Sequence, residues 1–261
     1  MIVGTLATYP PRQSSLVDVV RRVAPQLDVL RVVLNSYSAP IAEISGLPNV
    51  QQILPPVDLK ATGKFYPDIG ADDVVFLFDD DILYPDDYVR VTLGHMNRIG
   101  MDRAIFGYHA SLYVRPAFGV SKRRFRAWRR RNDRTYLPEA RRVFSFRSSL
   151  DVATEVEQIG TGTLAGLRKF IAPFDYVRTA QQFVDVRHAR WCHEQGLKQI
   201  ALPRQAGWLP GREFEETIYK GFTLKSPAHV LDEVATYAFK LGHRSDMTGR
   251  KRRKGGFPWS N

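Results

Sequence analysis

Sulfur is scarce in this sequence, which has one cysteine, Cys192, among its 261 residues. A single cysteine excludes an internal disulfide and also a zinc site built from clustered cysteines. A chain without a disulfide framework fits a reducing compartment. We therefore expect a cytoplasmic protein.

Long hydrophobic runs are also missing. No window approaches the roughly 20 consecutive apolar residues that a membrane-spanning helix needs. The opening residues, MIVGTLATYPPRQ, lack the basic and then apolar pattern of a secretory leader. We expect neither export nor a membrane span. Hydrophobic residues still make up 44% of the chain, and this is enough for an ordinary globular core.

Acidic residues are outnumbered, with 27 Asp and Glu against 38 Lys and Arg, for a net charge of +11. Such a balance favours an anionic partner: nucleic acid, acidic lipid headgroups or a phosphorylated small molecule. Much of the excess lies in Lys122–Arg147 and in the tail. We expect one domain over residues 1–241 with a basic insertion at about 120–150, and a basic flexible tail over 242–261.

Hydrophobic patterning predicts an α/β fold. Residues 2–8 form an apolar strand that ends at Tyr9-Pro10-Pro11, and a helix and a second strand at 29–34 follow it. Strand, helix and strand with short links begin a βαβ unit and a parallel sheet. Further strands are expected near 50–54, 74–78, 104–108 and 199–202, and helices near 180–195 and 228–241.

Three acids follow the most hydrophobic of these strands, as Asp79-Asp80-Asp81. In α/β sheets ligands bind at the carboxyl ends of strands, and adjacent carboxylates repel one another unless a cation lies between them. Hard oxygen ligands suit Mg²⁺ or Mn²⁺. In extended backbone Asp79 and Asp81 would project to one side and Asp80 to the other. The alternative is a turn that caps the following helix, which we expect to begin at Pro85-Asp86-Asp87.

Two enzyme classes place acids after a buried strand. Haloacid-dehalogenase-type phosphatases carry theirs on the first strand and follow them with Gly-Thr or Gly-Val, whereas here the strand is internal and Tyr84-Pro85-Asp86 follows. The second class comprises nucleotide-sugar transferases of GT-A type. A series of segments in the right order resembles bacterial GT-A-fold glycosyltransferases related to family 2, over about residues 2–210. These segments are Thr5–Thr8 with Arg12, Gly63-Lys64-Phe65-Tyr66, FLFDDDILYPDDYV, a strand ending in His109, Gly160–Leu164, Phe183–Val186, Pro203-Arg204 and Trp208-Leu209.

The resemblance implies a single Rossmann-like domain with a mainly parallel sheet flanked by helices, and a nucleotide-sugar donor, with UDP as the expected nucleotide. It implies the following donor contacts: Thr8 and Arg12 at base and phosphate, Asn35 at the base, Lys64 at the nucleotide, Asp79 and Asp80 near the ribose, and Gly162 and Thr163 near the sugar. Asp81, with Asp79, would hold Mn²⁺ or Mg²⁺. Arg12 and Lys64 could instead be ordinary surface cations.

In the second half the resemblance assigns Asp185 as the catalytic base of an inverting transfer. Family members often carry Glu-Asp at this point, but here Val184 precedes the acid. The alternative is a helix N-terminal acid. His109 could contact sugar or acceptor or be structural. His188, one turn after Asp185, could assist it or a metal, or lie on the helix surface.

The leading prediction is therefore a metal-dependent glycosyltransferase that uses a glycan or lipid-linked acceptor in glycan or polysaccharide synthesis. The first alternative is a sugar-phosphate nucleotidyltransferase, although such enzymes usually have a Gly-rich basic first loop that Thr8–Arg12 lacks. The second is a nucleic-acid-binding protein, which the buried acids disfavour.

Arginines interleaved with aromatic residues in Lys122–Arg147, together with the tail Arg250–Lys254, predict peripheral docking on an anionic membrane, on the cytoplasmic face. The alternatives are a solvated insertion and a cradle for an acidic polysaccharide.

Overall fold

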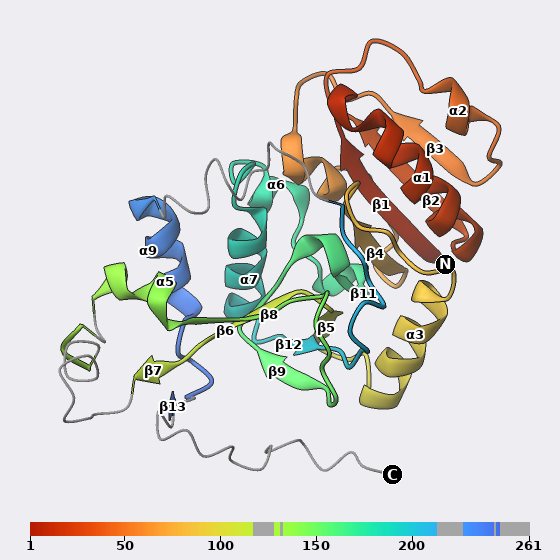
Figure 1. Cartoon of the computed structure of the whole chain (residues 1–261). Helices are drawn as coiled ribbons and strands as arrows, with labels where there is room; N and C mark the ends of the chain where they lie inside the picture. The colour runs from red at the N-terminus through yellow and green to blue at the C-terminus, as the bar shows by residue number, and fades with distance from the viewer. Residues whose placement is uncertain (117–127, 131–132, 213–226, 243, 246–261) are drawn as a thin grey trace.

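The computed structural model describes residues 1–116, 128–130, 133–212, 227–242 and 244–245. They form an α/β fold around an eight-stranded sheet of order β3-β2-β1-β4-β11-β5-β12-β9. Figure 1 shows β1 to β3 at one end of the molecule and helix α9 (Ala228–Tyr237) at the other. This Rossmann-like architecture, with a mostly parallel sheet flanked by helices, confirms the predicted fold class.

The first half of the sheet is wholly parallel. Strand β1 (Ile2–Thr8) leads through helix α1 (Gln13–Val23) to β2 (Val29–Leu34), which pairs with β1 from Val3 opposite Val29 to Thr8 opposite Leu34. The short helix α2 (Ala42–Ser45) precedes β3 (Val50–Ile53) at the edge. The predicted βαβ unit is confirmed, because the apolar β-branched runs of β1 and β2 are buried as parallel strands must be.

Strand β4 (Val74–Phe78) then pairs with β1 on the side away from β2. The order of the strands therefore reverses between β1 and β4. In open α/β sheets such a switch point leaves a crevice outside the carboxyl ends of the two strands, where ligands bind. Asp79–Asp81 and the loop after Thr8 follow the carboxyl ends of these two strands.

The second half of the sheet is mixed. Strands β5 (Ala104–Gly107) and β12 (Lys198–Ala201) are parallel to each other. Between β4 and β5 runs the antiparallel β11 (Ala165–Leu167), and β9 (Thr154–Val156) pairs antiparallel with β12.

Smaller sheets flank this half. One has the order β10-β6-β8, from Gln158–Ile159, Ala110–Tyr113 and Arg141–Phe144; the other pairs β7 (Arg115–Pro116) with β13 (Arg244–Ser245). Strands β6 and β8 were not predicted, and β8 lies inside the segment predicted as a basic insertion.

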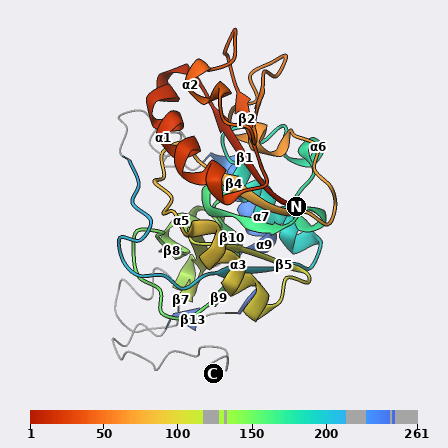
Figure 2. The same cartoon turned by 90° about the vertical axis from the view of Figure 1, so that its right-hand side faces the viewer.

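Alternation along β4 divides the core into two layers. Phe76 and Phe78 face α1 and the residues of α3 (Tyr88–Ile99), whereas Val75 and Leu77 face the opposite layer with Phe65. That layer also takes residues from α6 (Phe174–Val177) and α7 (Val184–Glu194). Figure 2 shows α1 on one side of β1 and β4 and α6 on the other. The site crevice therefore opens at the end of a sheet that is covered on both faces.

The turn after β4 is fixed by a distant part of the chain. Ile82 forms a β-bridge with Gly211, Leu83 N–H donates to Pro210 O at 2.8 Å, and Arg212 N–H donates to the Asp81 carbonyl at 2.7 Å. Helix α3 begins at Tyr88, later than predicted, because Pro85 accepts the Tyr88 N–H at 3.0 Å and closes a turn before the helix.

Parts of two predictions fall beyond the described residues. Of the basic segment, residues 117–127 and 131–132 lie outside them, as does Arg250–Lys254 of the tail. Membrane docking and the domain boundary at 241 therefore stay predictions. Within the portion of the chain that the structure describes, none of the helices has the length and apolar character needed to span a membrane.

Candidate active site

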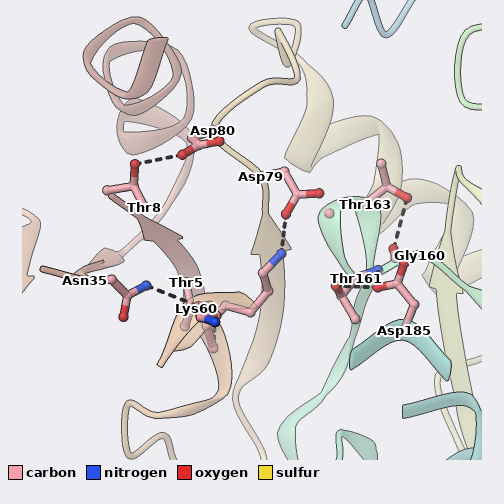
Figure 3. A network of polar contacts seen from close by, with 12 residues as sticks. Thr5, Thr8, Asn35, Lys60, Asp79, Asp80, Gly160, Thr161, Thr163 and Asp185 are labelled. Carbon is pink, nitrogen blue, oxygen red and sulfur yellow. Dashed lines mark hydrogen bonds and ion pairs between the residues drawn. The ribbon is translucent and has the colours of Figure 1, made fainter. Parts of the chain in front are cut away.

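Polar side chains from β1 and β4 meet at the switch point (Figure 3). The Thr8 hydroxyl at the end of β1 donates to Asp80 Oδ2 at 2.7 Å, across the junction of the two strands. Ser15, in the first turn of α1, donates its hydroxyl to the Asp80 carbonyl. These two contacts turn Asp80 toward β1 and join the ends of the strands.

Lys64 is the cation of this site. It lies in a 3-10 helix, Lys60–Phe65, whose Lys64 carbonyl accepts the Thr5 hydroxyl at 2.7 Å. Its side chain is only 3% exposed, so the alternative of a surface lysine is wrong. The ammonium group pairs with Asp79 Oδ1. Burial alone would lower the pKa of Lys64, but the negative charges of Asp79, Asp185 and Asp80 raise it above its usual value. Lys64 therefore stays protonated.

Asn35 holds this 3-10 helix in place. Its side-chain oxygen accepts the Leu59 N–H at 3.0 Å, and its amide group donates to the Lys60 carbonyl at 3.1 Å. The side chain is 2% exposed. Asn35 thus acts through the position of Lys64, and the base contact predicted for it stays a prediction without support from this geometry.

Burial changes the proton affinity of the acids. Loss of solvent raises the pKa of Asp80 to about 6; the Thr8 hydrogen bond opposes the rise and the charge of Asp79 adds to it. Loss of solvent, together with repulsion from Asp79 and Asp80, raises the pKa of Asp81 to about 7. Arg12 and Lys64 partly offset both shifts. Both acids therefore hold a proton up to a higher pH than a free aspartic acid does.

Loop 160–163 supplies the other wall of the site. Thr161 donates to Asp185 Oδ1 through its N–H at 2.9 Å and through its hydroxyl at 2.7 Å (Figure 3). A Cβ on Gly162 would lie 1.9 Å from Asp79 Oδ2, so a larger residue there would push the Asp79 carboxylate aside. The loop therefore contacts both Asp185 of α7 and Asp79, the residue that follows β4.

Thr163 faces inward. Its hydroxyl accepts the N–H groups of Tyr108 at 3.1 Å and His109 at 2.9 Å, and its side chain is fully buried. Thr163 fixes the end of β5 against the loop. Because its hydroxyl already accepts two backbone N–H groups, the ligand contact predicted for Thr163 stays a prediction.

His109 and Arg12 line the site. The His109 Nδ1 atom is buried and has no hydrogen-bond partner among the described residues. Burial lowers the pKa of His109, against the opposing charge of Asp185. Arg12 is 7% exposed, so the alternative of a solvated loop cation is wrong. Both side chains remain candidates for contact with substrate.

His188 differs from both interpretations given for it. It is fully buried, its Nδ1 atom lies 3.6 Å from Cys192 Sγ, and its ring packs on Phe65. Burial lowers its pKa to about 3. The surface interpretation is wrong, because α7 turns this face into the core. Its contacts give it no part in the site.

The acids do not form a ready-made metal cage. No group of three His, Cys, Asp or Glu side chains converges within the described ranges. Asp79 turns toward Lys64 and Asp80 toward Thr8, whereas the Asp81 carboxylate accepts no hydrogen bond from any residue that the structure describes. The donor set fits Mg²⁺ or Mn²⁺ only where one or two carboxylates are completed by water and phosphate oxygens, which is a common arrangement for Mg²⁺.

Sequence reasoning missed Tyr84. Its hydroxyl lies between Asp79 and Gly162 and is hydrogen-bonded to the backbone of both. Tyr84 could have been found from its place in Tyr84-Pro85, shortly after the three acids. The motif FLFDDDILYPDDYV was used for the resemblance, but no role was given to its first tyrosine.

No protein-family model matches this chain, and no curated protein sequence matches it. Among solved structures, a 4-diphosphocytidyl-2C-methyl-D-erythritol synthase is similar over 86% of this chain and 98% of its own, with 10% identity and a TM-score of 0.45. A nucleotidyl transferase from Methanothermobacter covers 77% and 86% at 11% identity, with a TM-score of 0.40. A mannose-6-phosphate isomerase from Helicobacter pylori covers 76% and 85% at 11% identity, with a TM-score of 0.40.

This comparison corrects the leading functional prediction. The similar structures include proteins described as a nucleotidyl transferase and a diphosphocytidyl synthase. None of these three structures is described as a glycosyltransferase, and the glycosyltransferase prediction is withdrawn. Nothing in the sequence comparison supports membership of glycosyltransferase family 2. At these identities and TM-scores the likeness carries no argument about chemistry, which has to be argued from the site.

Proposed function

We propose that this chain is a sugar-phosphate nucleotidyltransferase. A phosphate oxygen of the sugar phosphate attacks the α-phosphorus of a nucleoside triphosphate, the bond from that phosphorus to the bridging oxygen breaks, and pyrophosphate leaves. The products are a nucleoside diphosphate sugar and pyrophosphate. Residues 1–241 would act as one catalytic domain.

The observation that carries the proposal is the buried Lys64 ammonium at the switch point. Lys64 is almost fully buried, stays charged and lies at the carboxyl ends of β1 and β4. Nucleotidyl transfer develops negative charge on the oxygens around phosphorus. A fixed cation in a site shielded from water stabilises such charge strongly. Arg12, on the loop after β1, supplies a second cation toward the same acids.

The attacking group also fits the site. A sugar phosphate is already an anion at neutral pH, so its attack needs no general base. Asp185 Oδ1 is held by both donors of Thr161, and the contact fixes loop 160–163. We therefore assign Asp185 a positioning role in place of the base role predicted from the resemblance.

A divalent ion has a place in this scheme. Asp81, with the Asp79 oxygen that Lys64 does not hold, would bind Mg²⁺ or Mn²⁺ together with phosphate oxygens. When bound, the ion would neutralise charge on the triphosphate and the leaving pyrophosphate. Asp80 would keep its bond to Thr8 and hold β1 against the acidic turn.

The sugar phosphate would lie on the side of loop 160–163. His109 is on that side, and Asp185 and Arg141 act on its charge. Arg141 Nε donates to the Ser111 hydroxyl at 2.8 Å, which orients its guanidinium group from strand β8. Nucleotide and sugar phosphate would thus approach from the two halves of the sheet.

The test is a matrix of the common nucleoside triphosphates against sugar 1-phosphates, with Mg²⁺ or Mn²⁺ and with EDTA. We expect pyrophosphate release and a nucleoside diphosphate sugar by mass spectrometry for at least one pair, only with the divalent ion. Asp81→Asn should remove most of this turnover, and Asp86→Asn, in the exposed turn nearby, should not. Absence of both product formation and metal-dependent triphosphate binding across the matrix would overturn the proposal.

A further inference from the structure

Tyr84 lies in the turn that follows the acids, and its ring has no freedom to move. The side chain is fully buried. Its ring meets Phe78 edge-on at 4.8 Å between centroids and Tyr88 at 4.9 Å. Such edge-to-face contacts fix the orientation of an aromatic ring. The position of the hydroxyl is therefore set by the core beneath the site.

The hydroxyl joins the two walls of the site. It accepts the Asp79 N–H at 2.8 Å and donates to the Gly162 carbonyl at 2.5 Å. Burial raises the pKa of Tyr84 well above its usual value, so the hydroxyl keeps the proton that it donates. One atom thus satisfies a backbone group of the acidic turn and a backbone group of loop 160–163.

The Asp79 carboxylate packs closely against loop 160–163 at Gly162. A Cβ on Gly162 would lie 1.9 Å from Asp79 Oδ2 and 2.4 Å from Asp79 Cγ. On its other side the loop is tied to Asp185 through Thr161 and to the end of β5 through Thr163. A change in the bridge would therefore move Asp79 relative to the whole second half of the site.

We propose that Tyr84 is a positioning residue that sets the spacing between Asp79 and loop 160–163, and through it the spacing between bound nucleotide and sugar phosphate. Tyr84 acts through the backbone of Asp79 and Gly162 and touches no substrate. The inference rests on the proposed function for its catalytic consequence, but the spacing itself can be measured without ligand.

Tyr84→Phe is the first test, and Tyr108→Phe is its control. Tyr108 belongs to the same aromatic cluster and is fully buried, and its hydroxyl contacts Thr92 at 3.0 Å, away from the acids. We expect both variants to unfold at lower temperature. Only Tyr84→Phe should speed hydrogen exchange in peptides that contain the Asp79 amide and loop 160–163, because it alone frees that amide.

The catalytic consequence is read from kinetics and from metal-dependent binding of the nucleoside triphosphate by calorimetry. Tyr84→Phe should lower kcat about tenfold or more with a smaller change in KM for the sugar phosphate, whereas Tyr108→Phe should stay within about twofold. Gly162→Ala, which displaces Asp79 from the loop side, should reproduce the kcat loss even where Tyr84→Phe folds poorly.

The outcomes separate the two proposals. If Tyr84→Phe speeds hydrogen exchange at the Asp79 amide, the positioning role is supported. If the wild-type protein forms no nucleotide sugar with any substrate pair, the proposed function is rejected. An active protein in which Tyr84→Phe matches Tyr108→Phe in exchange, kcat and KM overturns the positioning role.

Discussion

The two halves of the central sheet build their parts of the site from different interactions. The β1 to β4 half is parallel, and its site side chains are charged: Lys64 pairs with Asp79, and Asp80 accepts from Thr8. The half from β11 to β9 contains antiparallel pairs, and its loop 160–163 is held by hydrogen bonds to Asp185 and to the end of β5. The charged side chains Lys64, Asp79 and Asp80 lie on the side where phosphates would bind, and loop 160–163 on the opposite wall is positioned by hydrogen bonds.

The largest effect should follow from removing the buried cation of the first half. Lys64→Met keeps the length of the side chain and leaves Asp79 without its partner. We expect pyrophosphate release to fall by about 10²-fold to 10³-fold, as for loss of a preorganised charge in an active site. The measurement is steady-state turnover. Lys60→Met, at an exposed lysine of the same 3-10 helix, should stay near wild type, and equal losses in both variants would contradict the prediction.

A substitution in the second half should lower the free energy of unfolding without weakening nucleotide binding. Arg187 of α7 makes a two-pronged ion pair with Glu233 of α9, and the two side chains are 18% and 11% exposed. Glu233→Gln should lower the free energy of unfolding by about 2 to 3 kcal/mol, since it leaves a largely buried arginine without its carboxylate. Urea denaturation measures this loss.

Metal-dependent nucleotide affinity should stay unchanged in Glu233→Gln, because α9 lies at the opposite end of the molecule from β1 to β3 (Figure 1). The control is Glu194→Gln, which removes a more exposed pair with Arg190. A loss of nucleotide affinity in Glu233→Gln would show that the two halves are coupled more tightly than their contacts indicate.

The second half should also show the clearest acid sensitivity. His188 has its pKa lowered from 6.5 to about 3 by burial, so the unfolded chain takes up a proton there before the folded one does. The contribution of His188 to the free energy of unfolding is complete above its pKa in the unfolded chain. It is lost as the pH falls toward its pKa in the folded protein. At about pH 5 the loss is about 2 kcal/mol relative to neutral pH.

His188→Leu should remove that part of the pH dependence. Because Asp80 and Asp81 shift in the opposite sense, the informative quantity is the difference between wild type and variant in unfolding free energy at each pH. The exposed His193→Gln serves as control. A constant difference between wild type and His188→Leu from neutral pH to about pH 5 would refute the buried neutral state.

The smallest effect should come from the hydrogen bond that joins β1 to β4. Thr8→Val removes a donor that lowers the pKa of Asp80. The pKa of Asp80 in the folded protein should therefore rise further. The stability that protonated Asp80 contributes is lost as the pH rises through this pKa, so in Thr8→Val the loss should extend to a higher pH than in wild type. Loss of one such bond costs about 1 kcal/mol, which corresponds to about fivefold weaker metal-dependent nucleotide binding at neutral pH. Calorimetry across pH measures both effects, and the control is Thr154→Val on the edge strand β9, where the hydroxyl donates to the Val152 carbonyl.

The same contrast explains what the sequence could predict. The first half was predicted closely, because β1, β2 and β4 are continuous apolar runs and the acids follow the last of them directly. Strands β6 and β8 were missed, because Tyr113 pairs with Arg141 across a long basic segment, and an arginine-rich run hides the pattern of a strand. Pairing between distant short strands leaves little local signal.

Within the site, residue types were predicted better than their orientations. Lys64 and Asp79, each predicted as a donor contact, form an ion pair with each other, whereas Asn35 and Thr163 satisfy backbone groups. Buried N–H and C=O groups need partners, and a sequence does not show which polar side chain will serve them. Tyr84 escaped for the same reason, since its partners are both backbone atoms.

The bridge between Ile82 and Gly211 has a consequence for how the protein is made. During synthesis from the N-terminus, β1 to β4 can pair long before residues 210–212 leave the ribosome. The acidic turn then gains its cross-links to Pro210 and Arg212 only after most of the chain has emerged. A nascent chain would therefore already hold Asp79 and Asp80 through Lys64 and Thr8, whereas the backbone at Asp81 and Leu83 would be fixed only late in translation.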